Sequence, residues 1–216
     1  MKQDLLEKLV DKSITKDELF KMVTQDFTLL PKIIDGVSSE KAAIRYGCGK
    51  VLMNLSDEYP DKLYPHMNFF IDLLGSKYRI LTWQAMYIIA NLTKVDKDKK
   101  FDMIFDKYFS FINDEYMVTV ANVVGNSGKI ALAKPYLTPK ITKELLKVEG
   151  LKTTAHLTEE CKKVITENVI QSINMFFPQI ENKDEVISFV KKHTNSSRKT
   201  LKAKSEKFLN KWDTLN

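Results

Sequence analysis

A five-residue apolar stripe that returns at a near-constant period constrains the fold of this chain more than any other feature. The first copy has the spacing of one face of a helix with about 3.6 residues per turn, and consists of Ile44, Cys48, Val51, Leu52 and Leu55. The same places 37 positions later hold Leu81, Ala85, Ile88, Ile89 and Leu92. After 35 more, four of the five are filled by Tyr116, Val120, Val123 and Val124. Such a period predicts a helical-repeat protein.

Two weaker copies of the stripe follow. The fourth has Ser172 as its misfit and otherwise contains Ile165, Val169, Ile173 and Phe176. The fifth has Ser205 out of line and otherwise contains Leu201, Phe208, Leu209 and Trp212. The step from the third copy to the fourth is 49 residues, so we expect an insertion, and residues 147–158 with Gly150 are its predicted place.

An amphipathic segment precedes each copy, at residues 29–37, 64–74, 101–112, 138–146 and 183–192. The sequence therefore predicts about five helix pairs. One pair cannot bury its own apolar face, so stability must come from stacking the pairs. We expect residues 1–26, with helices near 3–10 and 16–24, to cap the N-terminal end, and residues 27–216 to form one continuous repeat domain.

Residues 29–56, LLPKIIDGVSSEKAAIRYGCGKVLMNLS, resemble a HEAT repeat. The segment has a proline-bearing first helix, a short polar turn, and a second helix that opens with the apolar–arginine pair Ile44–Arg45. The resemblance implies an all-α fold, a right-handed α–α superhelix of HEAT-like pairs, with the second helices along its concave side. HEAT-type motifs specify architecture and say little about function.

The positions opposite the apolar stripe should then face a partner on the concave side. Aromatic and amide residues gather there, and the predicted partner-binding set is Tyr46, Lys50, Trp83, Tyr87, Asn91 and Asn122. Aromatic side chains supply contact area and amides supply orientation, which suits recognition of a peptide or protein. The alternative is that Trp83 and Tyr87 pack between neighbouring helices, and that asparagines near helix ends satisfy free carbonyl groups.

The net charge of +6 is concentrated near the end of the chain, where residues 183–211 carry nine basic and three acidic side chains. A basic patch is typical of proteins that bind nucleic acid or an acidic partner. The candidate patch residues are Arg198, Lys199, Lys202, Lys207 and Lys211. The alternative is a solvated helix, because the lysines of the last helix are spread around most of its circumference.

No phosphate-binding, nucleophile, zinc-hydrolase or dinucleotide motif is present, so we predict a non-catalytic scaffold without metal or cofactor. The alternative function is nucleic-acid binding through the basic C-terminal repeat. An enzymatic alternative is kept because the expected fold resembles that of HEAT-like DNA-alkylation-repair glycosylases. That resemblance makes Trp83 the candidate aromatic and Glu167 the candidate acid. With two cysteines and no apolar run long enough to span a bilayer, we expect a cytoplasmic protein with no membrane contact.

Overall fold

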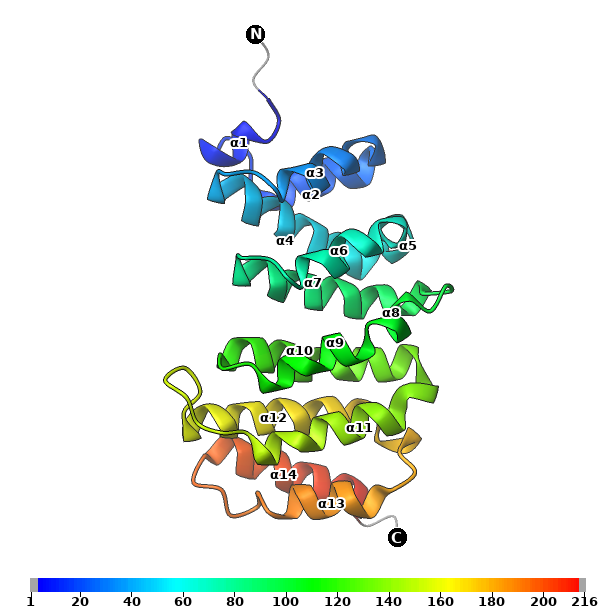
Figure 1. The fold of residues 1–216 in the computed structure, drawn as a ribbon, viewed down its shortest axis with the longest axis vertical. Helices are drawn as coiled ribbons and strands as arrows, with labels where there is room; N and C mark the ends of the chain where they lie inside the picture. Colours follow the sequence, from blue (N-terminus) through cyan, green and yellow to red (C-terminus); the bar gives the residue numbers. More distant parts are fainter. Residues whose placement is uncertain (1–3, 214–216) are drawn as a thin grey trace. The chain divides into compact units, whose positions relative to one another are not determined.

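The computed structural model describes residues 4–213, which divide into two compact units with their border between Asp98 and Lys99 (Figure 1). The first three residues of the predicted N-terminal cap lie outside the described residues. Within the described part, regular structure is helical except for an isolated bridge between Thr154 and Leu157. The prediction of an all-α helical-repeat fold is therefore confirmed.

The first unit is built around two long helices. In chain order its α-helices are α1 (Glu7–Val10), α2 (Lys16–Gln25), α3 (Leu30–Gly36), α4 (Ala42–Glu58), α5 (Pro60–Leu63), α6 (Met67–Leu73) and α7 (Arg79–Leu92). Helix α2 begins with a capping box, in which the Thr15 hydroxyl and the Glu18 carboxylate satisfy each other's backbone N–H groups. Helix α4 packs against α2, α3 and α7, and α6 covers α7. The pairs α3–α4 and α6–α7 are thus two copies of the predicted repeat.

The second unit holds the remaining helices. They are α8 (Lys100–Met103), α9 (Phe105–Ser110), α10 (Met117–Ala133), α11 (Thr138–Leu146), α12 (Glu159–Phe176), α13 (Lys183–Lys191) and α14 (Lys199–Trp212). Helices α10, α12 and α14 follow one another in space, because α12 packs against both of the others (Figure 1). Helices α11 and α13 lie against α12 and α14 respectively. The second helices of the repeats therefore form one layer within this unit.

The periodic stripes form the core of both units. All five stripe residues of α4 and all five of α7 are buried. Among them is Cys48, where burial raises the pKa of the thiol to about 12, so the side chain behaves as a small apolar group. In α12 the misfit Ser172 is also buried, and its Oγ accepts a hydrogen bond from the backbone N–H of Gly128 at 2.6 Å. The serine therefore lies at a close contact between α10 and α12.

The segment from Leu151 to Thr158 is the irregular stretch between α11 and α12. It folds back onto the start of α10, where the His156 ring stacks on Tyr116 at 4.2 Å between centroids. The Thr154 hydroxyl donates to the carbonyl of Glu115, and the Met117 N–H donates to the carbonyl of His156. These contacts give this exposed segment a defined position against one helix end.

Candidate functional site

Five of the six predicted partner-binding residues lie on α4 and α7 in the first unit, and Asn122 alone lies elsewhere. The rings of Tyr46, Trp83 and Tyr87 are half-buried, and Lys50 is exposed. The sequence left open whether these rings contact a partner or pack between neighbouring helices. Half-buried rings are compatible with both roles, because part of each ring is covered by its neighbours and part is exposed to solvent. With Asp57, these residues define what we call the α4–α7 face.

Tyr46 is held in place by a buried arginine. The Arg45 guanidinium carbon lies 3.8 Å from the ring centroid of Tyr78 and 4.7 Å from that of Tyr46, and the two rings meet edge to face. Nη1 of the same arginine donates to the backbone carbonyls of Ser39 and Glu40 in the turn before α4. The arginine that opens the second helix therefore orders both the turn and the aromatic pair.

Asp57, which the sequence did not single out, organises the other end of the face. The Tyr87 hydroxyl donates to the Asp57 carboxylate at 2.7 and 2.9 Å, and Asn91 Nδ2 donates to the same carboxylate at 2.8 Å. Burial and this carboxylate raise the pKa of Tyr87 to about 12. The sequence did contain one indication. Asp57 lies near the C-terminus of α4, where the helix dipole disfavours a negative charge, so a hydrogen-bond donor close to its carboxylate could be expected.

Asn91 itself is fully buried, with its Nδ2 also bonded to the Ser56 hydroxyl at 2.9 Å. Its predicted role as a direct partner contact is therefore corrected to one of support. Both of these partners, Ser56 and Asp57, lie on α4 rather than on the helix that carries Asn91. A buried amide that bonds two side chains of the neighbouring repeat fixes the register of α7 on α4.

A hollow of about 820 Å³ adjoins the face at its Tyr46 end. The first turns of α4 form one wall, with Tyr46 and Lys50. The other wall is formed by α1, with Leu9, and by the segment between α1 and α2, with Ile14. Two of the predicted binding residues thus line a concave surface rather than a flat one, and concave, mostly apolar surfaces are where ligands and peptides bind.

Asn122, the sixth predicted residue, belongs to the second unit. It is half-buried on α10, and its Nδ2 donates to the Val118 carbonyl one turn earlier at 2.8 Å. Asn126 repeats this arrangement by donating to the carbonyl of Asn122.

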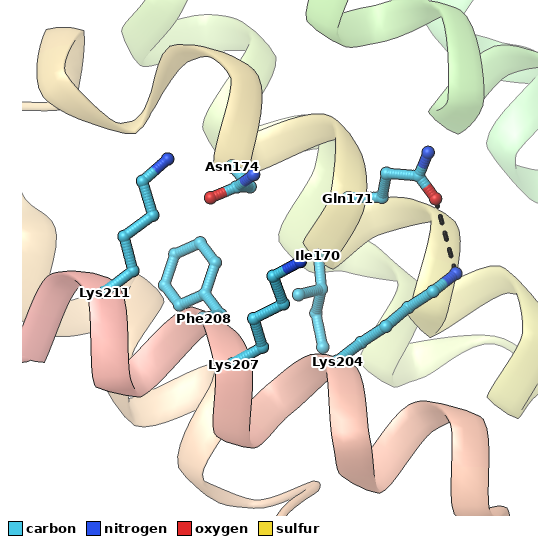
Figure 2. Close-up of a pocket in the computed structure, with 7 residues that line it drawn as sticks. All are labelled: Ile170, Gln171, Asn174, Lys204, Lys207, Phe208 and Lys211. Atoms are coloured by element: carbon cyan, nitrogen blue, oxygen red, sulfur yellow. Dashed lines mark hydrogen bonds between the residues drawn. The ribbon is translucent and has the colours of Figure 1, made fainter.

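The predicted basic patch separates into three environments. Arg198 is bonded to Glu160 at 2.8 Å and to Glu167 at 2.5 Å. Lys202 lies 3.9 Å from Glu206 on its own helix, and Lys199 is exposed. Lys207 and Lys211 instead line a groove between α12 and α14 (Figure 2). The structure therefore does not place the five residues on one surface.

The groove has a volume of about 360 Å³ and an apolar floor formed by Ile170 and Phe208. Three lysines, Lys204, Lys207 and Lys211, extend along it from α14 (Figure 2). The α12 side contributes Gln171 and Asn174. We call these seven residues the α12–α14 groove.

Glu167, the candidate acid of the glycosylase comparison, is buried and fully engaged. Burial alone would raise its pKa, but hydrogen bonds from Thr200 and Arg198, together with the charge of Lys204, hold the pKa below its ordinary value. A carboxylate held in its ionised form by an arginine and a lysine is a poor proton acceptor. Its geometry is that of a structural ion pair.

Residues 4–213 have neither a membrane-spanning helix nor a cluster of metal-binding side chains. None of the helices in this part of the chain is long and apolar enough to cross a membrane. The same residues contain no cluster of three or more histidine, cysteine or acidic side chains that could hold a metal ion.

Comparison with known proteins places the chain by its fold. No protein-family model matches it, and no curated protein matches it. Among solved structures it is similar to the designed armadillo repeat protein YIII(Dq)4CqI, with a TM-score of 0.60 and 16% identity over 95% of this chain and 90% of that one. The designed armadillo repeat protein YIII(Dq.V1)4CPAF, in complex with peptide (KR)4, gives 0.60 and 13% over the same shares.

An engineered protein known from a crystal structure is also similar, with a TM-score of 0.53 and 12% identity over 98% of both chains. At such identities the likeness concerns the fold alone. The chain therefore has an all-α helical-repeat fold, similar to the fold of these designed armadillo repeat proteins.

Proposed function

We propose that this chain is a non-catalytic scaffold that binds a peptide or protein segment on the α4–α7 face. The observation that carries the proposal is the set of part-exposed aromatic rings on two helices whose register is fixed by the Asp57 hydrogen bonds. Rigid aromatic side chains lose little conformational entropy on binding, so they are effective anchors.

The similar designed protein whose structure contains peptide (KR)4 supports a peptide as the ligand class. We further propose that the repeats are HEAT-like, that their second helices line a concave side, and that residues 27–216 act as one continuous domain. The two cysteines are both free thiols, which fits a cytoplasmic protein.

A selection from a random peptide library displayed on phage tests the binding function. Enriched peptides would be synthesised with a fluorophore and titrated by fluorescence anisotropy against the wild type, Trp83→Ala and a matched control, Phe69→Ala. Phe69 is a half-buried aromatic of α6 outside the α4–α7 face, so its truncation costs comparable packing.

We expect Trp83→Ala to weaken binding by at least about tenfold, because a part-buried aromatic anchor contributes on the order of 1–2 kcal/mol, while Phe69→Ala binds as the wild type does. Circular dichroism would confirm that both variants stay helical. Failure to enrich any peptide, or equal loss of affinity in two folded variants, would contradict the proposal.

A further inference from the structure

We propose that the α12–α14 groove is a binding site for an acidic peptide segment of a protein partner. The carboxylates of that segment would pair with Lys207 and Lys211. This surface lies in the second unit and uses none of the residues of the α4–α7 face. Each proposal can therefore fail without the other.

The lysines form a ladder with a spacing that carboxylates can match. Lys204, Lys207 and Lys211 are three and four residues apart, so they share one side of α14 and rise by about 4.5 and 6 Å along its axis at about 1.5 Å per residue. Side chains on one face of an extended peptide are separated by roughly 6–7 Å, which is close to this spacing.

The charge of the groove is not neutralised by the protein. Among residues 4–213, neither Lys207 nor Lys211 forms an ion pair, and only Lys204 has an acidic neighbour, Glu167 at 3.5 Å. Basic residues close by in sequence are compensated differently, since Lys191 pairs with Asp213 at 2.9 Å and Lys192 with Glu149 at 2.8 Å. The groove is thus a local positive surface that an acidic partner complements.

Other groups of the groove are suited to a peptide. Asn174 Oδ1 accepts a hydrogen bond from Trp212 Nε1 at 2.8 Å, which fixes the amide with its Nδ2 group as a donor for a peptide carbonyl. Gln171 is exposed and accepts from Lys204 at 3.3 Å, as Figure 2 shows. Beneath them, Phe208 and Ile170 are 3% and 2% exposed, so they close the groove and leave the polar groups above them to contact a peptide.

The same features disfavour nucleic acid. Phe208 is only 3% exposed, so its ring cannot stack on a base. Arg198 is already bonded to Glu160 and Glu167, and neither Lys199 nor Lys202 lines the groove. Three lysines within roughly 11 Å of helix are far fewer than the six to ten phosphate contacts typical of strong binders.

The probe for the test is a short fluorescein-labelled peptide with alternating Asp and Glu residues around a central Leu. Its binding to the full chain would be measured by anisotropy at about 50 and 200 mM NaCl, beside a lysine-based counterpart peptide and a short single-stranded DNA. The groove variant is Lys207→Glu/Lys211→Glu. The matched control is Lys199→Glu/Lys202→Glu, which makes the same change in net charge on the same helix but outside the groove.

We expect the acidic peptide to bind the wild type and to lose at least about tenfold in affinity with the groove variant, but no more than about threefold with the control. The groove variant should also gain affinity for the lysine-based peptide. In NMR spectra, the side-chain amides of Gln171 and Asn174 should shift when the acidic peptide is added to the wild type.

The proposal would be overturned by equal loss of affinity in both variants, which indicates non-specific attraction, or by absence of peptide binding at the lower salt concentration. DNA binding that is tighter than peptide binding and falls steeply with salt would replace the peptide with nucleic acid. The exposed positions of all four lysines make it straightforward to verify by circular dichroism that both variants fold.

Discussion

Replacing Gly128 with alanine tests the central packing of the second unit. Gly128 lies where α10 meets α12, and an added Cβ would stand 3.0 Å from the Ser172 carbonyl oxygen and 3.1 Å from its Oγ. The carbonyl belongs to the backbone of α12, so it can withdraw only if the two helices separate. Met175 Sδ, at 2.6 Å from the same Cβ, ends a flexible side chain and can move aside.

The expected magnitude follows from three contributions. Overpacking at a tight helix crossing costs about 1–3 kcal/mol, and weakening of the hydrogen bond from Gly128 N–H to Ser172 Oγ costs about 1 kcal/mol. The higher helix propensity of alanine returns about 1 kcal/mol. We therefore expect Gly128→Ala to lower the free energy of unfolding by about 1–3 kcal/mol, which corresponds to a fall in Tm of roughly 2–10 °C.

Gly125 on the same helix supplies the control, because no atom lies within 4 Å of a Cβ added there. Gly125→Ala should stabilise the protein by about 0.5–1 kcal/mol through helix propensity alone. Urea and thermal unfolding followed by circular dichroism at 222 nm would compare both variants with the wild type. If Gly128→Ala proved as stable as Gly125→Ala, α10 and α12 would not be in close contact at this point, and the reasoning would be refuted.

Three further predictions concern polar contacts. The folded-state pKa of Glu167 is lowered, so its contribution to stability is present above about pH 4.5 and is lost as the pH falls through the folded pKa. Glu167→Gln should therefore be less stable than the wild type at neutral pH. When the free energy of unfolding is measured against pH, the variant should lose less stability on acidification than the wild type. Asp57→Asn should lower the pKa of Tyr87 from about 12, because the carboxylate no longer disfavours the tyrosinate. The pKa would be measured by ultraviolet difference titration, with Tyr87→Phe as the reference. An unchanged pKa would leave burial as the sole cause. Lys134→Met removes the buried ammonium 2.8 Å from the Asp102 carboxylate, so it should cost about 1–3 kcal/mol in urea unfolding and raise the pKa of Asp102 measured by NMR; a variant as stable as the wild type would contradict this.

The helical architecture was predictable because burial imposes a period on the sequence. The stripes of α4 and α7 contain ten apolar positions, and all ten are buried. Hydrophobic burial is non-directional and depends only on which side of a helix a residue occupies, so a single sequence is sufficient to find it. The same logic explains why Tyr46 and Lys50 were correctly assigned to the side away from the stripe, while their exposure was left open.

Polar contacts between repeats could not be predicted in this way, because they depend on the register and distance between two helices. Asn91 has the same sequence position within its repeat as Asn126, yet it bonds Ser56 and Asp57 on another helix while Asn126 bonds the preceding turn of its own. Ser172 interrupts the apolar stripe of the sequence, yet its hydroxyl accepts a hydrogen bond from the Gly128 N–H where α10 and α12 are in close contact. Hydrogen bonds are directional, so their partners become visible only in three dimensions.

The distribution of charge on α14 bears on the two interpretations of the basic patch. A surface that serves only solubility is best made of both signs interspersed, and Lys202 with Glu206 provides this on one side of the helix. On the other side, Lys204, Lys207 and Lys211 share a face of α14 that carries no acidic residue of this helix, because Glu206 lies on the side of Lys202. Solvation does not require such segregation of sign, and it costs mutual repulsion among the lysines. An acidic partner would relieve that repulsion, so its binding should be favoured at low ionic strength and weakened by salt.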